Sequence, residues 1–110
     1  MAIFYTVDDD NFKGELMGAP WALVDLWAAW CAPCRQLESI LASVVPQYAD
    51  RVKFCKVDVD SSPLLVTKYN VQAVPTLLFL RTGTLKNRHV GLLSSGELEK
   101  ELDLFLEESA

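Results

Sequence analysis

Two cysteines spaced as C-x-x-C are the residues of this sequence best suited to carry out chemistry. Cys31 and Cys34 are separated by Ala32 and Pro33 and stand between an apolar run and an amphipathic pattern. If a helix begins near Cys31, residues three apart lie on one face with Cβ atoms about 5–6 Å apart. Cysteines whose Cα atoms are about 4.4–6.8 Å apart can close a disulfide. The pair therefore predicts thiol–disulfide exchange.

A position at a helix start gives the two sulfurs different predicted roles. First-turn N–H groups lack a helical partner and the helix dipole is positive there, which stabilises a thiolate at Cys31. The pKa of that thiol should therefore fall below the free value of about 8.5. Pro33 is tolerated because a first-turn N–H has no helical bond to lose. Cys34, one turn inside, is expected to be less accessible, so Cys31 is the predicted nucleophile and Cys34 the resolving thiol.

A C-x-x-C pair can also belong to a structural zinc site or to a cysteine hydrolase, and each of these needs further side chains beside the cysteines. A structural zinc site needs four ligands, and only Cys55 and His89 remain to join the pair. A cysteine hydrolase needs a base beside its nucleophile, and His89 is the sole histidine. Both residues are predicted in strands, and both alternatives remain open. For Cys55 itself we expect a small buried hydrophobe, with a regulatory thiol as the alternative.

Asp25 is a second candidate for chemistry because it is the one charged residue in an apolar run at 21–27. Such a run is typical of a central strand covered on both faces. Desolvation there raises the pKa of a carboxyl group, which can then accept or return a proton near neutral pH through water. The alternative is a strand aspartate that points to solvent.

Hydrophobic patterns predict the elements that position these residues. Strands are expected at 3–7, 21–27, 52–59, 76–81 and 85–90. Helices are expected after the acidic run 8–10, from Cys31 to near Pro46, after a cap at 61–63, and after the capping box of Ser94 and Glu97. The order β-α-β-α-β-α-β-β-α implies an α/β fold, a three-layer α/β/α sandwich with a mixed central sheet.

Composition and charge limit the other classes of function. The 110 residues suit a single domain over 1–110, and 51 % hydrophobic with 23 % charged residues is typical of a globular protein. A net charge of −5 argues against nucleic-acid binding. The longest uncharged stretch, 69–80, is interrupted by Pro75 and is shorter than the roughly 20 residues of a membrane-spanning helix. No signal peptide is recognisable, so we expect a cytoplasmic location.

The segment 27–34, Trp-Ala-Ala-Trp-Cys-Ala-Pro-Cys, resembles the active-site signature of the thioredoxin family. Further matches follow in family order: Val-Asp-Leu-Trp at 24–27, Lys-Val-Asp-Val-Asp at 56–60, Val-Pro-Thr at 74–76, Gly83, and Val-Gly at 90–91. The resemblance covers practically the whole chain. It implies the thioredoxin fold and a protein-disulfide reductase.

The resemblance also implies roles for residues around the cysteines. Asp25 would exchange a proton with the resolving Cys34. Lys56 occupies the family position that pairs electrostatically with this aspartate, although an ordinary surface lysine is the alternative. Ala32 stands where the family usually has glycine. Its extra methyl restricts the turn, and this dipeptide influences the redox potential.

A substrate surface is implied beside the pair. The resemblance places a cis Val74–Pro75 bond next to the cysteines and leaves the backbone of Val74 to bind an extended substrate chain. We expect Trp30, Val74 and Gly91 to form an apolar docking surface for client proteins.

The family resemblance implies the following partners. The chain would bind no cofactor or metal, and its redox group would be the Cys31–Cys34 disulfide. A flavin-dependent thioredoxin reductase would re-reduce it with NADPH. Expected clients are ribonucleotide reductase, peroxiredoxins and methionine sulfoxide reductases, with the chain acting as a monomer. The alternatives are a thioredoxin-fold oxidase or isomerase, and a non-catalytic binding module.

Overall fold

The strands and helices follow one another in the predicted order. The structure is a computed structural model that describes residues 4–108. Its elements are β1 (Tyr5–Thr6), η1 (Lys13–Met17), β2 (Ala22–Trp27), α1 (Ala32–Tyr48), β3 (Lys53–Asp58), η2 (Val59–Ser61), α2 (Pro63–Lys68), β4 (Thr76–Arg81), β5 (Thr84–Val90) and α3 (Ser95–Glu108). The short 3-10 turn η2 is the one addition. Ile3, the predicted start of the first strand, lies outside the described residues.

The strands form one mixed sheet with β2 at its centre. The order is β1-β3-β2-β4-β5; β1, β3 and β2 run parallel, and β4 and β5 are antiparallel to their neighbours. Five of the six residues of β2 are buried, as a strand covered on both faces should be. In this register Asp25 lies beside Lys56 of β3 and Leu77 of β4.

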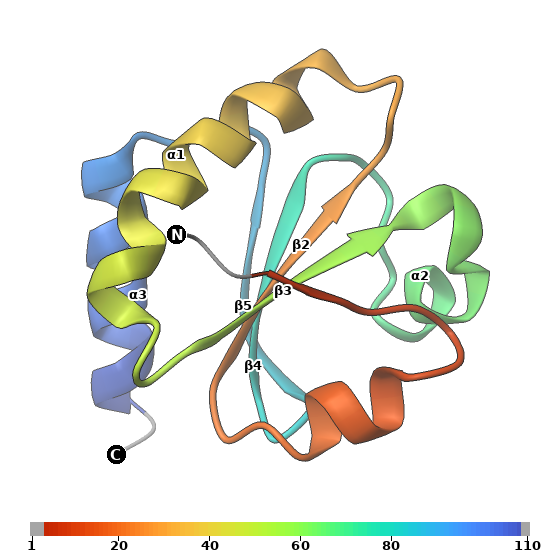
Figure 1. The fold of residues 1–110 in the computed structure, drawn as a ribbon, viewed down its shortest axis with the longest axis horizontal. Coiled ribbons are helices and arrows are strands. Elements are labelled where there is room, and N and C mark those ends of the chain that lie inside the picture. The colour runs from red at the N-terminus through yellow and green to blue at the C-terminus, as the bar shows by residue number, and fades with distance from the viewer. Residues whose placement is uncertain (1–3, 109–110) are drawn as a thin grey trace.

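Helices cover both faces of the sheet, with α1 and α3 on one side and η1 and α2 on the other (Figure 1). Successive strand residues enter opposite cores, the period of two of a β-strand. Leu23 and Phe79 pack with the helices α1 and α3, whereas Val24 and Leu78 pack beneath η1 and α2. This alternation confirms the predicted sandwich. No helix within residues 4–108 has the length and apolar character needed to cross a bilayer.

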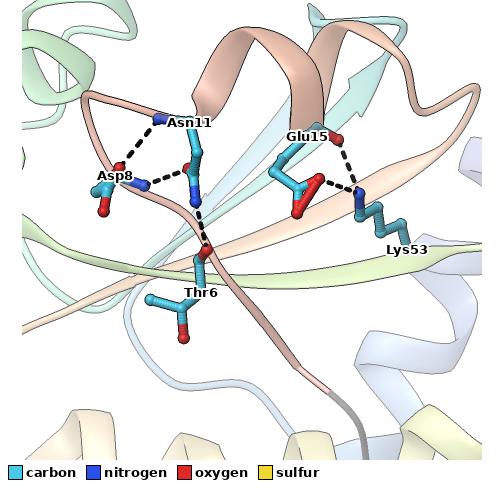
Figure 2. A network of polar contacts seen from close by, with 5 residues as sticks. All are labelled: Thr6, Asp8, Asn11, Glu15 and Lys53. Carbon is cyan, nitrogen blue, oxygen red and sulfur yellow. Dashed lines mark hydrogen bonds and ion pairs between the residues drawn. The ribbon is translucent and has the colours of Figure 1, made fainter.

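Side-chain hydrogen bonds hold the segment between β1 and η1 against the sheet (Figure 2). The Asn11 side-chain amide donates to the carbonyl oxygen of Thr6 at 3.0 Å, and its backbone N–H donates to Asp8 Oδ1 at 3.0 Å. Lys53 of β3 reaches across to η1, where its Nζ lies 3.1 Å from Glu15 Oε2. These bonds fix the path of the acidic run 8–10.

The N-terminus of α2 is capped from a distant part of the chain. Asp9 Oδ2 accepts from the N–H of Leu64 at 3.1 Å, and Oδ1 accepts from that of Leu65 at 3.0 Å. Ser62 occupies the N-cap position without a side-chain cap hydrogen bond. The predicted cap position, with Pro63 in the first turn, is confirmed, but the Ser62 side chain does not supply the capping hydrogen bond. The carboxylate that replaces it lies 55 residues from Leu64, beyond the reach of any local pattern.

Candidate active site

The two cysteines lie where the chain passes from β2 into α1. Cys31 is the N-cap residue with an extended backbone, and Pro33 stands in the first turn. A disulfide joins Cys31 to Cys34, with the Cα atoms 5.3 Å apart. The backbone N–H of Cys34 donates to Cys31 Sγ at 3.2 Å. A first-turn N–H without a helical partner thus points at the sulfur predicted to carry negative charge.

Exposure does not distinguish the two cysteines. Each is 4 % exposed in the disulfide form, so Cys34 is not the less accessible residue that the sequence predicted. Both pack with Ala28 in a small apolar cluster that Trp27 and Val74 border. Position at the helix start and the hydrogen bond to Sγ are therefore what differentiate them.

A cleft of about 290 Å³ is lined by both Asp25 and Cys34. Its walls come from β2, the loop that follows, α1 and β3: Asp25, Trp27, Ala28, Ala29, Cys34, Arg35, Glu38 and Lys56. This volume is large enough to hold water that could carry a proton between the carboxyl group and the sulfur.

Asp25 is buried and poorly solvated, in contrast to the solvent-facing alternative. It is 2 % exposed, and its Oδ1 has no hydrogen-bond partner among the described residues. Burial raises the pKa of this carboxyl group from 3.8 to about 7. The charge of Lys56 opposes this rise and that of Glu38 adds to it. Near neutral pH the group can both accept and return a proton.

Lys56 does not form an ion pair with Asp25, although the two are neighbours in register. Its Nζ lies 3.4 Å from Glu38 Oε1 and 5.0 Å from the ring centre of Trp27. It acts on Asp25 as a nearby charge rather than as a bonded partner. Glu38 is not among the site residues predicted from the sequence. Its spacing of four residues from Cys34, which puts both on one helix face, is the signal that could have found it.

Two of the three predicted docking residues, Trp30 and Val74, line one cleft, and Val74 packs against the cysteines. The third, Gly91, is hydrogen-bonded to Pro75, the residue after Val74. The Val74–Pro75 peptide bond is cis, and the N–H of Gly91 donates to the carbonyl oxygen of Pro75 at 2.9 Å. Trp30 is 69 % exposed and its Nε1 donates to Asp60 Oδ2 at 3.0 Å. Trp30 and Val74 line the same shallow cleft of about 230 Å³. An apolar surface therefore borders the disulfide.

The other candidate residues lie away from the pair. Cys55 is 1 % exposed in the core beneath η1 and α2, and burial raises the pKa of its thiol to about 12. The buried-hydrophobe prediction for Cys55 is thus confirmed. His89 Nε2 lies 3.2 Å from the carbonyl oxygen of Leu92, and the histidine lines neither cleft. Within residues 4–108, no three His, Cys, Asp or Glu side chains gather as metal ligands would.

Comparison with known proteins agrees with this arrangement. The thioredoxin family model matches residues 3–104. The chain belongs to the thioredoxin family. The thioredoxin of Acidithiobacillus ferridurans is 38 % identical over 103 residues, which are 93 % of this chain and 94 % of the relative. Thioredoxin 1 of Synechococcus elongatus is 34 % identical over 107 residues, which are 96 % and 100 % of the two chains. A chloroplastic M-type thioredoxin of Pisum sativum is 32 % identical over 101 residues, covering 91 % of this chain and 59 % of the relative.

Membership of the thioredoxin family identifies the fold of the sheet and the function of the cysteine pair. The mixed sheet with its helices is the thioredoxin fold, and the chain is a protein-disulfide reductase. Thioredoxins carry out thiol–disulfide exchange with their own disulfide and hold no bound cofactor, and here that group is Cys31–Cys34. Their partners, as a class, are a reductase and proteins that contain disulfides.

Proposed function

We propose that this protein reduces client disulfides with Cys31 as nucleophile, Cys34 as resolving thiol and Asp25 as proton carrier. The observation that carries the proposal is the 3.2 Å hydrogen bond from the Cys34 N–H to Cys31 Sγ. In the reduced protein the same donor would stabilise a thiolate at Cys31. Within residues 4–108 no hydrogen bond to Cys34 Sγ is found, and Cys34 lies two residues after Ala32, the first residue of α1.

The reaction proceeds in two exchanges. The Cys31 thiolate attacks one client sulfur, the client disulfide breaks, and its second sulfur leaves as a thiolate that takes up a proton. Cys34 then gives its thiol proton to the Asp25 carboxylate through water in the cleft, and its sulfur attacks Cys31 Sγ. The Cys31–Cys34 bond forms and the first client sulfur leaves with the electron pair. Two electrons have passed from the chain to the client.

Docking of the client is assigned to the surface beside the pair. Trp30, Val74 and Gly91 would contact an extended client segment, and Pro75 would hold Val74 in place. Exposure of Trp30 and the cleft that it shares with Val74 support this role. Ala32 and Pro33, both exposed in the first turn of α1, would shape the surface that faces the client disulfide.

The proposal also covers the oligomeric state, the cellular location, the reductase and the client proteins. The chain would act as a monomer and as one domain over 1–110, in cytoplasmic electron transport. A flavin-dependent thioredoxin reductase would re-reduce it at the expense of NADPH. Ribonucleotide reductase, peroxiredoxins and methionine sulfoxide reductases are the expected clients. The similarity to thioredoxins over nearly their full length supports these assignments.

Turnover of insulin disulfides by dithiothreitol tests the proposal. The unmodified protein should accelerate the reaction, and Cys31→Ser should reduce the rate to that without protein because the nucleophile is lost. Cys55→Ala is the matched control, since it removes a thiol that the proposed reaction does not use, and it should retain activity. Full activity of Cys31→Ser would contradict the proposal. An unmodified chain without any turnover would favour the non-catalytic binding module.

The reduction potential of the pair separates reductase from oxidase. Equilibration with glutathione should give a value near the known thioredoxin potential of about −270 mV. A value near the roughly −120 mV of strong thiol oxidases would instead support the oxidase alternative.

A further inference from the structure

The carboxylate of Glu38 lies in the proton-transfer cleft and has no part in the mechanism proposed above. Glu38 is on α1, four residues after Cys34, and lines the cleft together with Cys34 and Asp25. Its Oε1 lies 3.4 Å from Lys56 Nζ. The Glu38 side chain is 56 % exposed and that of Lys56 is 22 % exposed, so the pair spans the outer part of the cleft.

Few other charged groups face Asp25 from the elements packed against it. Lys56 comes from β3, and Glu38 and Arg35 come from α1. The guanidinium of Arg35 donates to the carbonyl oxygen of Ala29 at 2.9 Å. On the other side of β2, the β4 neighbour of Asp25 is the uncharged Leu77. Cys34, the remaining titratable group of the cleft, is held in the disulfide.

Glu38 and Asp25 therefore compete for one ammonium group. Lys56 is the register neighbour of Asp25, yet its ammonium is bonded to Glu38. Without that partner, the positive charge of Lys56 would act unopposed on the Asp25 carboxylate and favour its ionised form.

We propose that Glu38 is a positioning residue for the proton step, because its carboxylate holds the Lys56 ammonium in the outer part of the cleft and so limits the action of that positive charge on Asp25. The inference rests on the proposed role of Asp25 and deepens it. Protonated Asp25 can return a proton to Cys34 when the disulfide is opened, and ionised Asp25 can accept one when it closes. A carboxyl group that titrates near the working pH can do both.

Substitution of Glu38 by glutamine tests the proposal, since it keeps the shape and removes the charge. The titration of Asp25 can be followed in the oxidised protein by the NMR signal of its carboxyl carbon between pH 5 and 9. The midpoint should fall by about 0.5 pH unit in Glu38→Gln, the order expected of one charge across a partly solvated cleft.

Asp50→Asn is the matched charge control. It removes the same charge just beyond the other end of α1, at a residue that lines a different cavity, so the midpoint of Asp25 should stay within about 0.1 pH unit. A shift in Glu38→Gln no larger than in Asp50→Asn, or a rise, would overturn the proposal.

A double-mutant cycle with Lys56→Gln tests whether Glu38 acts through Lys56. In the Lys56→Gln background, the Glu38→Gln substitution should move the midpoint of the Asp25 titration by less than half of the shift that it causes when Lys56 is present. A full shift in that background would mean that Glu38 repels the Asp25 carboxylate directly, and the positioning role would be wrong.

The pH profile of insulin reduction separates this proposal from the proposed function. If both are right, the profile of Glu38→Gln moves to lower pH by the same amount as the NMR midpoint. A midpoint that moves while the rate profile stays in place would overturn the role of Asp25 in the reaction, and with it any effect of Glu38 on the rate. A midpoint that does not move would overturn the role of Glu38 alone.

Discussion

At the scale of single residues, Asp25 is buried in a place where the fold disfavours a charged carboxylate, although the proposed reaction needs that carboxylate to accept a proton. Its pKa is raised from 3.8 to about 7 by burial. The folded state therefore holds the proton more tightly than the unfolded chain does. The stability contributed by the protonated carboxyl is complete below about pH 4 and is lost as the pH rises through about 7.

Asp25→Asn should consequently stabilise the oxidised protein at alkaline pH. Because the variant cannot ionise, urea unfolding at pH 8.5 should give a free energy of unfolding higher by up to about 4 kcal/mol. At pH 4.5 the gain should shrink to about 1 kcal/mol, since the wild-type carboxyl is protonated there in the folded state. Equal stability of variant and wild type at both pH values would mean that the carboxyl is well solvated.

Cys55 should be inert in the folded protein because its thiol is buried and its pKa is raised to about 12. Alkylation of the reduced native protein with iodoacetamide at pH 8 should modify Cys31 and Cys34 only. In urea the third thiol should react as well. Mass spectrometry of the intact chain counts the adducts, and a third adduct under native conditions would instead support the regulatory thiol.

At the scale of elements, the helix starts differ in how far their caps could be predicted from sequence. The capping box that opens α3 is local, with Ser94 Oγ accepting from the N–H of Glu97 at 3.1 Å, and the spacing of the two residues revealed it. The start of α2 at Pro63 was predicted, but the acceptor that caps it, Asp9, could not be, because it belongs to another part of the chain. Patterns within a few residues reveal local caps but not caps that arise from tertiary packing.

Asp9→Ala should weaken α2, because the N–H groups of Leu64 and Leu65 lose their acceptor. The expected loss is about 1 kcal/mol in the free energy of unfolding, the usual size for an N-cap. Amide hydrogen exchange should be faster in α2 than in wild type. Asp10→Ala is the control, since the Asp10 carboxylate bonds to neither leucine. Equal effects of the two variants would argue against the cap.

At the scale of the whole molecule, the sandwich could be predicted because strand and helix periods are directly visible in the sequence. The apolar run around Asp25 indicated a central strand, and β2 is central. Side-chain pairing between elements could not be predicted in the same way. The family resemblance indicated an electrostatic pairing of Lys56 with Asp25. In the structure, α1 packs beside the sheet, and the Lys56 ammonium forms its ion pair with Glu38 of that helix instead. Pairs of this kind depend on the arrangement of elements that are distant in sequence.

The identity of the attacking sulfur is the central claim, and one experiment addresses it directly. The reduced Cys34→Ser variant, mixed with oxidised insulin, lacks the thiol that resolves the intermediate and should accumulate a mixed disulfide. Peptide mapping by mass spectrometry should place the insulin chain on Cys31, with Cys55 unmodified. An adduct on Cys55, or no mixed disulfide at all, would contradict the assignment of Cys31 as nucleophile, since a chain that attacks through Cys34 could not form one in this variant.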